Sequence, residues 1–147
     1  ALKAWTSRRP AGRACGLESM RILVTGADGF IGRNLRQHLA VRRGVQVVPV
    51  TRDTDPASLP SLVDGVDFVA HLAGVNRPKS ADEFVMGNVD VTAALVDAIA
   101  GCARRTGARP PVFYASSTQA EFDNPYGRSK LAGALALQRA MERRWNR

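Results

Sequence analysis

The chain alternates short apolar runs with longer stretches in which apolar side chains recur every three or four residues. The short runs predict buried strands, and the longer stretches predict helices that bury one face. Strands are predicted at 21–25, 45–50, 67–74 and 111–117. Helices are predicted at 31–41, 56–63, 89–105 and 126–144. Because strands and helices alternate, the sequence predicts an α/β fold with a parallel sheet that helices cover on both faces, a doubly wound arrangement.

Three glycines occupy the junction between the first predicted strand and the first predicted helix, in the segment TGADGFIG (Thr25–Gly32). Gly26 suits a tight turn out of the strand, Gly29 lets the backbone approach a phosphate, and Gly32 lets the helix pack closely on the sheet. The N–H groups at the start of the helix would then hold the anion. The pattern indicates a dinucleotide pyrophosphate site of the Rossmann type. Its spacing, G-x-x-G-x-x-G, is one residue longer in the first gap than the commoner fingerprint, and a plain tight turn is the alternative.

The residues after the second predicted strand bear on the choice of cofactor. An acidic side chain there accepts from the ribose 2′-OH of NAD(H), whereas an arginine meets the 2′-phosphate of NADP(H). Arg52 follows the strand, and Asp53 follows Arg52. We therefore expect NADP(H) in preference to NAD(H), and Asp53 keeps NAD(H) open. Arg33 either assists Arg52 or is simply an exposed helix residue.

A tyrosine and a lysine four residues apart, Tyr126 and Lys130, begin the last predicted helix and share one of its faces. A nearby ammonium group stabilises a phenolate, so such a pair can donate a proton to a carbonyl oxygen while a hydride arrives at the carbon. Ser116 and Ser117 end the preceding strand, at the edge where sites of parallel sheets gather. The alternatives are a chance pair and serines that cap a turn.

Positive charge exceeds negative charge, with a formal net charge of +8 over 147 residues. Residues 1–19 carry four basic side chains and one acidic side chain, a net +3, without any periodicity. We expect a disordered basic tail over 1–19 and a single domain over 20–147. A basic arm for an acidic partner is the alternative use of the tail. Nucleic acid is not expected as a partner, because no basic helix with interleaved aromatic residues is evident.

The positions of the cysteines and histidines indicate which metal and redox chemistry to expect. Cys15 and Cys102 lie far apart without neighbours at metal-ligand spacing, which is typical of free thiols in a reducing compartment. His38 and His71 show no ligand spacing either, so no metal site is expected. No apolar run approaches the ~20 residues that cross a bilayer, and the first residues lack the apolar segment of a secretory signal. We therefore expect a cytoplasmic protein that does not use a membrane.

Several motifs occur together in an order that resembles the extended short-chain dehydrogenase/reductase superfamily, which includes the NAD-dependent epimerases and dehydratases. They are the glycine loop, HLAG at 71–74, GNV at 87–89, SS at 116–117 and YGRSK at 126–130. The resemblance covers residues 20 to about 144. It implies a Rossmann-type fold and an NAD(P)-dependent oxidoreductase that acts on a nucleotide sugar.

Longer matches narrow this resemblance. The segments HLAGVNRP (71–78), SSTQA (116–120) and DNPYGRSKLAG (123–133) are similar to the capsular-polysaccharide assembly reductases. That family implies an NADPH-dependent reduction of a UDP-4-keto-6-deoxy-hexosamine on the way to UDP-N-acetyl-L-fucosamine, with a separate C-terminal cupin domain for epimerisation. The expected partner is therefore a UDP-sugar, and the full-length form is compatible with a homo-oligomer.

The resemblance also implies roles for individual residues. Tyr126 would be the catalytic acid, Lys130 would bind the nicotinamide ribose and tune Tyr126, and Ser117 would be the catalytic serine, with Ser116 as the fallback. Asn88 would lie near the nicotinamide as a further catalytic residue. The expected cofactor-binding residues are Gly26, Gly29, Phe30, Ile31, Gly32, Arg52, Leu72, Ala73, Gly74, Tyr126 and Lys130.

The chain departs from the family pattern in two places. The stretch from Arg52 to Asp67 leaves little room for the usual third strand, which we expect to be missing or vestigial. The sequence ends at Arg147, whereas family members continue with another strand and a substrate-binding region. The resemblance therefore implies a fragment that is truncated before the substrate-binding region and has little or no turnover alone. Arg77 either meets the substrate or is an exposed turn residue.

Two other interpretations stay open. An epimerase or dehydratase of the same superfamily would hold NAD tightly. A dehydratase normally needs acidic partners beside its serine, where Thr118 and Gln119 stand here. A non-catalytic dinucleotide-binding module would be expected to lose the pair formed by Tyr126 and Lys130.

Overall fold

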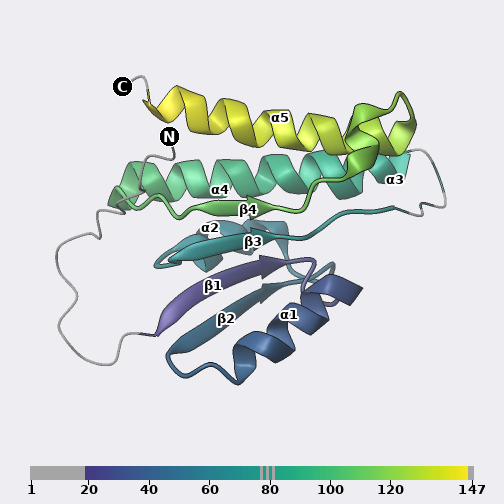
Figure 1. Ribbon diagram of the computed structural model, residues 1–147. Helices are drawn as coiled ribbons and strands as arrows, with labels where there is room; N and C mark the ends of the chain where they lie inside the picture. Colours follow the sequence, from purple (N-terminus) through teal and green to yellow (C-terminus); the bar gives the residue numbers. More distant parts are fainter. Residues whose placement is uncertain (1–18, 77, 79, 81, 146–147) are drawn as a thin grey trace, which may run out of the picture.

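A computed structural model describes residues 19–76, 78, 80 and 82–145, which form one sheet flanked by helices (Figure 1). The strands are β1 (Met20–Thr25), β2 (Val45–Val50), β3 (Phe68–His71) and β4 (Val112–Tyr114). The helical elements are α1 (Phe30–Ala40), η1 (Pro56–Ser58), α2 (Leu59–Val63), α3 (Asp82–Phe84), η2 (Val85–Asp90), α4 (Val91–Thr106), η3 (Thr118–Glu121) and α5 (Pro125–Trp145). The predicted basic tail lies outside the described residues except for Ser19.

The four strands run parallel in the order β2-β1-β3-β4. Thr25 pairs with Val50 on one side and with His71 on the other, and His71 pairs with Tyr114. The carboxyl ends of all four strands therefore lie level at one edge of the sheet. The predicted Rossmann-type parallel sheet is confirmed, and ligands of such sheets bind at this edge.

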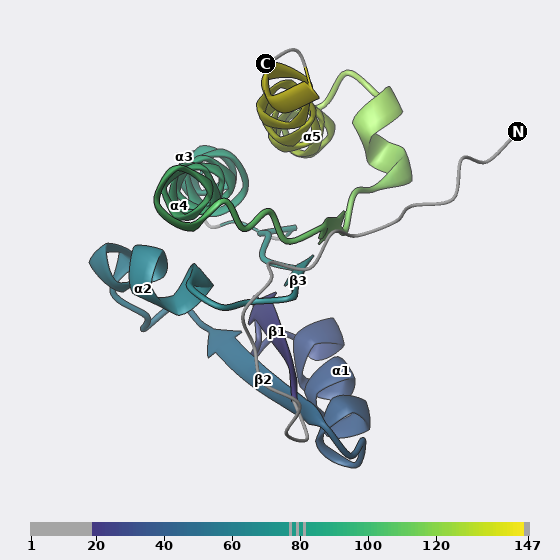
Figure 2. The same ribbon diagram turned by 90° about the vertical axis from the view of Figure 1, so that its left-hand side faces the viewer.

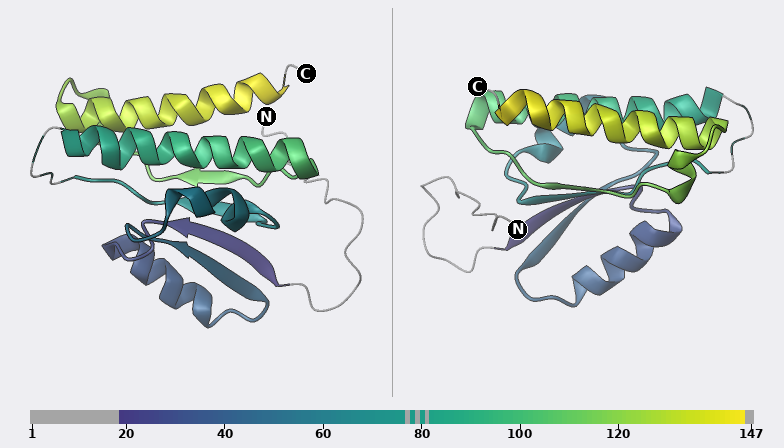
Figure 3. Two further views of the ribbon diagram at one scale, coloured as in Figure 1. Left: turned by 180° about the vertical axis from the view of Figure 1, so that it is seen from behind. Right: turned by 45° about the horizontal axis from the view of Figure 1, so that its top comes forward.

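Helices cover both faces of the sheet, with α1 on one face and α2 and α4 on the other (Figure 2). Successive strand residues point to opposite faces and divide the core into two clusters. The cluster on the α1 side contains the buried residues Ile22, Val24, Ala27 and Ala70. The cluster under α2 and α4 contains Leu23, Val48, Val50, Leu59, Val63, Val66, Val69, Leu95, Ala98, Ile99 and Cys102. Helix α5 lies alongside α4 (Figure 3).

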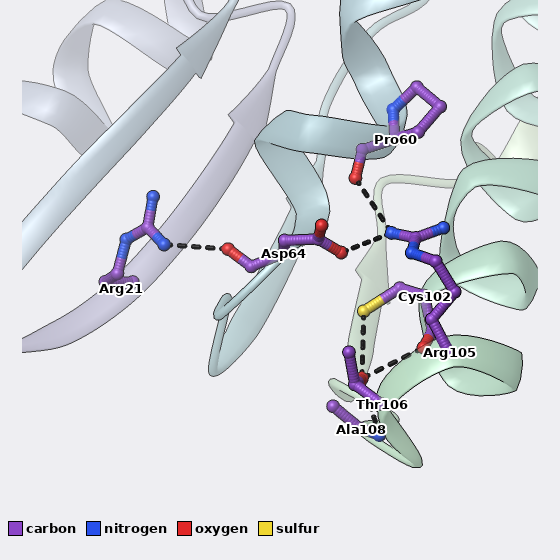
Figure 4. A network of polar contacts seen from close by, with 7 residues as sticks. All are labelled: Arg21, Pro60, Asp64, Cys102, Arg105, Thr106 and Ala108. Carbon is purple, nitrogen blue, oxygen red and sulfur yellow. Dashed lines mark hydrogen bonds and ion pairs between the residues drawn. The ribbon is translucent and has the colours of Figure 1, made fainter.

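The segment between β2 and β3 forms η1 and α2 and contains no strand among the described residues, which confirms the expected loss of the third strand. Asp64, directly after α2, fastens this short connection to its neighbours (Figure 4). Its carbonyl oxygen accepts from Nη1 of Arg21 at 2.7 Å, and its carboxylate pairs with Arg105 of α4. Arg105 also donates to the carbonyl oxygen of Pro60 at 3.5 Å. These contacts orient α2 between β1 and α4.

The long central helix begins earlier than the predicted residue 89, because α3, η2 and α4 follow one another without a break over Asp82–Thr106. The predicted start left Gly87 outside the helix. In the structure a Cβ at Gly87 would overlap the side chain of Val75, so the glycine allows η2, a π-helical turn, to pack on the loop after β3.

By length and composition the segment Asp82–Thr106 would also qualify as a membrane-spanning helix, which the sequence analysis did not expect. Packing in the core explains part of its apolar character. Leu95 and Ile99 are 1% and 3% exposed and pack against the sheet. A helix that covers a sheet needs such a face.

The ends of two strands also differ from the prediction. β3 ends at His71 rather than at residue 74, and β4 ends at Tyr114 rather than at residue 117. The residues that follow leave the sheet and form the loops at its carboxyl edge. These loops carry many of the predicted site residues.

Candidate functional site

The glycine loop after β1 touches the loop after β3. Gly26 has a φ of +64°, a conformation that favours glycine. A Cβ at Gly26 would lie 2.8 Å from the backbone nitrogen of Ala73. Two predicted cofactor-binding loops therefore meet at backbone-to-backbone distance, and a side chain at Gly26 would push them apart.

The N-terminal end of α1 is open to an acceptor from outside the chain. Its N-cap, Gly29, provides no side-chain hydrogen bond, and the first turn contains no acidic residue. A Cβ at Gly32 would overlap the carbonyl oxygen of Gly26, so the helix approaches the loop closely. Phe30 and Ile31 are 81% and 60% exposed in the first turn. Unsatisfied N–H groups and a positive helix end suit a phosphate, so this part of the chain fits the predicted pyrophosphate.

Arg52 lies in a turn directly after β2, beside the glycine loop. The nitrogen of Ala27 donates to the carbonyl oxygen of Val50 at 3.1 Å, which joins the two segments. Arg52 and Asp53 are both exposed. The strand order places them at the side of the glycine loop opposite β3. They are therefore placed to contact one end of a ligand that crosses the edge of the sheet.

Gly74, Asn88 and Lys130 meet at the other side of the glycine loop. A Cβ at Gly74 would lie 2.8 Å from Oδ1 of Asn88 and 3.3 Å from Nζ of Lys130. The Asn88 side chain is buried and fully hydrogen-bonded. Its Oδ1 accepts from the nitrogen of Val75 at 2.8 Å, and its Nδ2 donates to the Val75 carbonyl oxygen at 3.0 Å and to Oγ of Ser129 at 2.9 Å. In this structure Asn88 holds the loop after β3 against α5.

Lys130 is only 4% exposed, and burial lowers its pKa. Its Nζ lies 4.6 Å from the centre of the Tyr114 ring, a cation–π distance. Within the described residues no carboxylate pairs with it. A buried ammonium group without an anion is unfavourable unless oxygen acceptors satisfy it. The ammonium group is therefore available to a ligand that brings hydroxyl or other oxygen acceptors to Gly74.

Tyr126 lies in the first turn of α5, four residues before Lys130 as predicted. Its ring is half-buried and lies 5.8 Å from the ring of Phe84, measured between centroids. Asn124 precedes the helix and accepts from the nitrogen of Gly127 at 2.7 Å. Ser129 donates to the Tyr126 carbonyl oxygen at 2.7 Å. The start of α5 is thus held on both sides of the tyrosine.

Ser117 caps η3, where its Oγ accepts from the nitrogen of Gln119 at 3.2 Å. The capping role that the sequence left open is therefore present. The cap uses the oxygen as an acceptor and leaves the hydroxyl hydrogen to donate elsewhere. Ser116 is exposed beside it.

The sequence analysis missed two residues that contribute to the candidate site, Tyr114 and Ser129. Tyr114 donates to the carbonyl oxygen of Lys130 at 3.2 Å and lies under its ammonium group. Burial, and then the charge of Tyr126, raise the pKa of Tyr114, which stays neutral. Ser129 links Asn88 to the first turn of α5. The sequence carried one weak signal for Tyr114, which lies two residues before Ser116.

The remaining predicted residues have simpler positions. Leu72 packs against the core cluster on the α1 side, and Ala73 contributes backbone. Arg77 lies outside the described residues. Among the residues that the structure describes, no group of His, Cys, Asp and Glu side chains could hold a metal ion.

Comparison with known proteins points to one family. The NAD dependent epimerase/dehydratase family matches residues 22–145. A UDP-2-acetamido-2,6-beta-L-arabino-hexul-4-ose reductase of Pseudomonas aeruginosa is 52% identical over 119 residues, which cover 81% of this chain and 31% of that protein. The chain therefore spans about a third of the length of this relative.

Solved structures agree in fold. The capsular polysaccharide assembling protein CapF from Staphylococcus aureus is 40% identical, with a TM-score of 0.67 over 83% of this chain and 32% of that chain. MoeE5, solved with UDP-glucose and NAD, is 28% identical, with a TM-score of 0.67 over 79% of this chain and 47% of that chain.

Proposed function

Because the chain belongs to the NAD dependent epimerase/dehydratase family, we propose that it forms the cofactor-binding part of a sugar-nucleotide 4-ketoreductase. The cofactor is NADP(H), and the substrate is a UDP-4-keto-6-deoxy-hexosamine for capsular polysaccharide synthesis. The ammonium group of the buried Lys130 carries this proposal, because it lies beside Gly74 and pairs with no carboxylate of the described residues. The 52% identity to a UDP-hexulose reductase supports the choice of substrate class.

The chain offers three contacts for the cofactor across the carboxyl edge of the sheet. The first-turn N–H groups of α1 bind the pyrophosphate. Arg52 contacts the 2′-phosphate at the β2 side, and Lys130 donates to ribose hydroxyl groups at the β3 and β4 side. β2 and β4 are the outer strands, three inter-strand spacings or roughly 14 Å apart. This span suits an extended ligand with a charged group at one end.

When bound, the cofactor supplies the hydride, and the chain supplies the proton. Tyr126 donates its phenolic proton to the ketone oxygen. Lys130, on the same helix face, stabilises the phenolate that remains. The Ser117 hydroxyl donates a hydrogen bond to the same oxygen, where negative charge develops.

Isothermal titration of the chain with NADPH and NADH tests the cofactor assignment. We expect NADPH to bind more tightly. Arg52→Gln should weaken NADPH binding about tenfold and leave NADH almost unchanged, because a charge-assisted contact is lost. Arg42→Gln, an exposed arginine after α1, is the matched control and should change neither affinity. Absence of binding by both dinucleotides would overturn the proposal, and tighter binding of NADH would overturn the cofactor choice.

An NAD-dependent sugar-nucleotide epimerase is the second candidate. The exposed Asp53 beside Arg52 favours it, and MoeE5 was solved with NAD and UDP-glucose. NAD that stays bound through purification would support the epimerase over the reductase. In either case Tyr126→Phe should leave dinucleotide affinity within about twofold, because the ring stays in place and only the hydroxyl group that serves the chemistry is lost.

A further inference from the structure

His71, the last residue of β3, lies completely buried between β1 and α4. Its Nδ1 lies 2.6 Å from Oγ1 of Thr25, and its Nε2 lies 2.8 Å from Oγ1 of Thr92. Thr25 also accepts from the nitrogen of Ala73 at 3.1 Å, and Thr92 donates to the carbonyl oxygen of Asn88 at 2.6 Å. One ring and two hydroxyl groups therefore connect the loop after β3 with η2.

The hydrogen-bond partners assign the tautomer of the ring. Thr92 uses its only hydrogen toward Asn88, so it must accept from Nε2–H of His71. Nδ1 then has no hydrogen and accepts from the hydroxyl group of Thr25. The Thr25 oxygen is then free to accept a hydrogen bond from the nitrogen of Ala73. Donation therefore runs in one direction, from Ala73 through Thr25, the His71 ring and Thr92 to the carbonyl oxygen of Asn88. Each hydrogen along this path has an acceptor.

The surroundings favour a neutral ring. The Tyr114 ring lies 5.4 Å away between centroids, and Lys130 is the nearby cation. Burial, and then the charge of Lys130, lower the pKa of His71 to about 4. A protonated ring would place a second positive charge near Lys130 and would force Thr25 to give up its donated hydrogen bond.

We infer that His71 is a positioning residue. Its ring, protonated at Nε2 only, fixes the spacing between the loop after β3, which contains Ala73, and η2, which contains Asn88. That spacing brings Gly74, Asn88 and Lys130 together. Only the test that measures NADPH binding rests on the proposed function, because the test of the tautomer uses no ligand. His71 itself does not contact the reacting atoms and acts through Thr25 and Thr92.

Nitrogen-15 NMR of the histidine rings in the 147-residue chain tests the tautomer directly. His38, exposed on α1, is the internal reference. At pH 7 we expect a fixed Nε2–H tautomer for His71 and the averaged signals of fast exchange for His38. A fixed Nδ1–H tautomer, or averaging at His71 as well, overturns the inference.

Two substitutions at Thr92 test the positioning role. Thr92→Val keeps the shape and removes the hydroxyl group, and Thr92→Ser keeps the hydroxyl group. We expect Thr92→Val to shift the amide resonance of Ala73, across the ring from the substitution, and to weaken NADPH binding about tenfold, the size of one lost buried hydrogen bond. Thr92→Ser should keep the amide resonance and the NADPH affinity of the unaltered chain.

The outcomes separate this inference from the proposed function. If the unaltered chain binds no dinucleotide, the proposed function fails, and the tautomer and the Ala73 resonance still decide the role of His71. If Thr92→Val lowers stability but leaves the Ala73 resonance and the NADPH affinity of the folded protein unchanged, His71 is only a core residue and the inference is wrong.

Discussion

Acidification should destabilise the folded chain well above the pH at which carboxylates are protonated, because of His71. The folded-state pKa of His71 is lowered from 6.5 to about 4. As pH falls below 6.5, the unfolded histidine binds a proton that the folded ring does not accept until about pH 4. The folded state therefore loses stability through this interval, and the loss is complete below pH 4.

The magnitude follows from the width of the interval. Between the two pKa values each pH unit lowers the free energy of unfolding by about 1.4 kcal/mol. From pH 7 to pH 5 the expected loss is about 2 kcal/mol, since little happens above 6.5. For a chain of this size that is a large share of the total stability. The charge of Lys130 contributes to this loss, because it lowers the pKa of His71 further by disfavouring a second cation nearby.

Urea unfolding followed by far-ultraviolet circular dichroism at pH 7, 6 and 5 measures this loss. His38→Gln is the control and should retain the full pH dependence, because His38 is exposed on α1. His71→Gln should unfold more easily at pH 7 but lose most of the dependence between pH 7 and pH 5. A flat stability profile in the unaltered chain, or a profile that His38→Gln abolishes, would refute the reasoning.

Three other substitutions and one control substitution test the fold and the site. Leu95→Ala, at a position 1% exposed, should lower the free energy of unfolding by about 3 kcal/mol in urea titrations; a change below about 1 kcal/mol would contradict the core assignment. Asp64→Asn removes an ion pair whose carboxylate side chain is 45% exposed, so less than about 1 kcal/mol should be lost in the same assay. Gly74→Ala places a Cβ 2.8 Å from the Asn88 amide and should weaken NADPH binding about tenfold by calorimetry. Gly101→Ala, whose Cβ meets only arginine side chains, should bind normally.

The sequence pattern predicts elements well where one face of a regular element is buried. Helix α1 was expected at 31–41 and is found at Phe30–Ala40. β2 was expected at 45–50 and is found at Val45–Val50. The apolar period in these segments reflects burial against the sheet, and burial is local enough to be read along the chain.

Tertiary contacts explain what the pattern did not predict. The start of the central helix was missed because Gly87 weakens a helix in isolation, and its value lies in the close contact with Val75. The hydrogen bonds of His71 join residues 46 and 21 positions away, and no local spacing encodes such pairs. The sequence therefore indicated Tyr126 and Lys130, which are four residues apart, but not the rings and hydroxyl groups that surround them.

The glycine positions at the carboxyl edge also change how mutational tolerance should be judged. Gly74 is exposed, and Gly26 and Gly87 are only partly buried, so a survey that ranks positions by accessibility would class them as permissive surface. Each of them lies where a methyl group would strike a neighbouring loop or side chain. A deep mutational scan of this chain should therefore show three intolerant positions that accessibility alone would not identify.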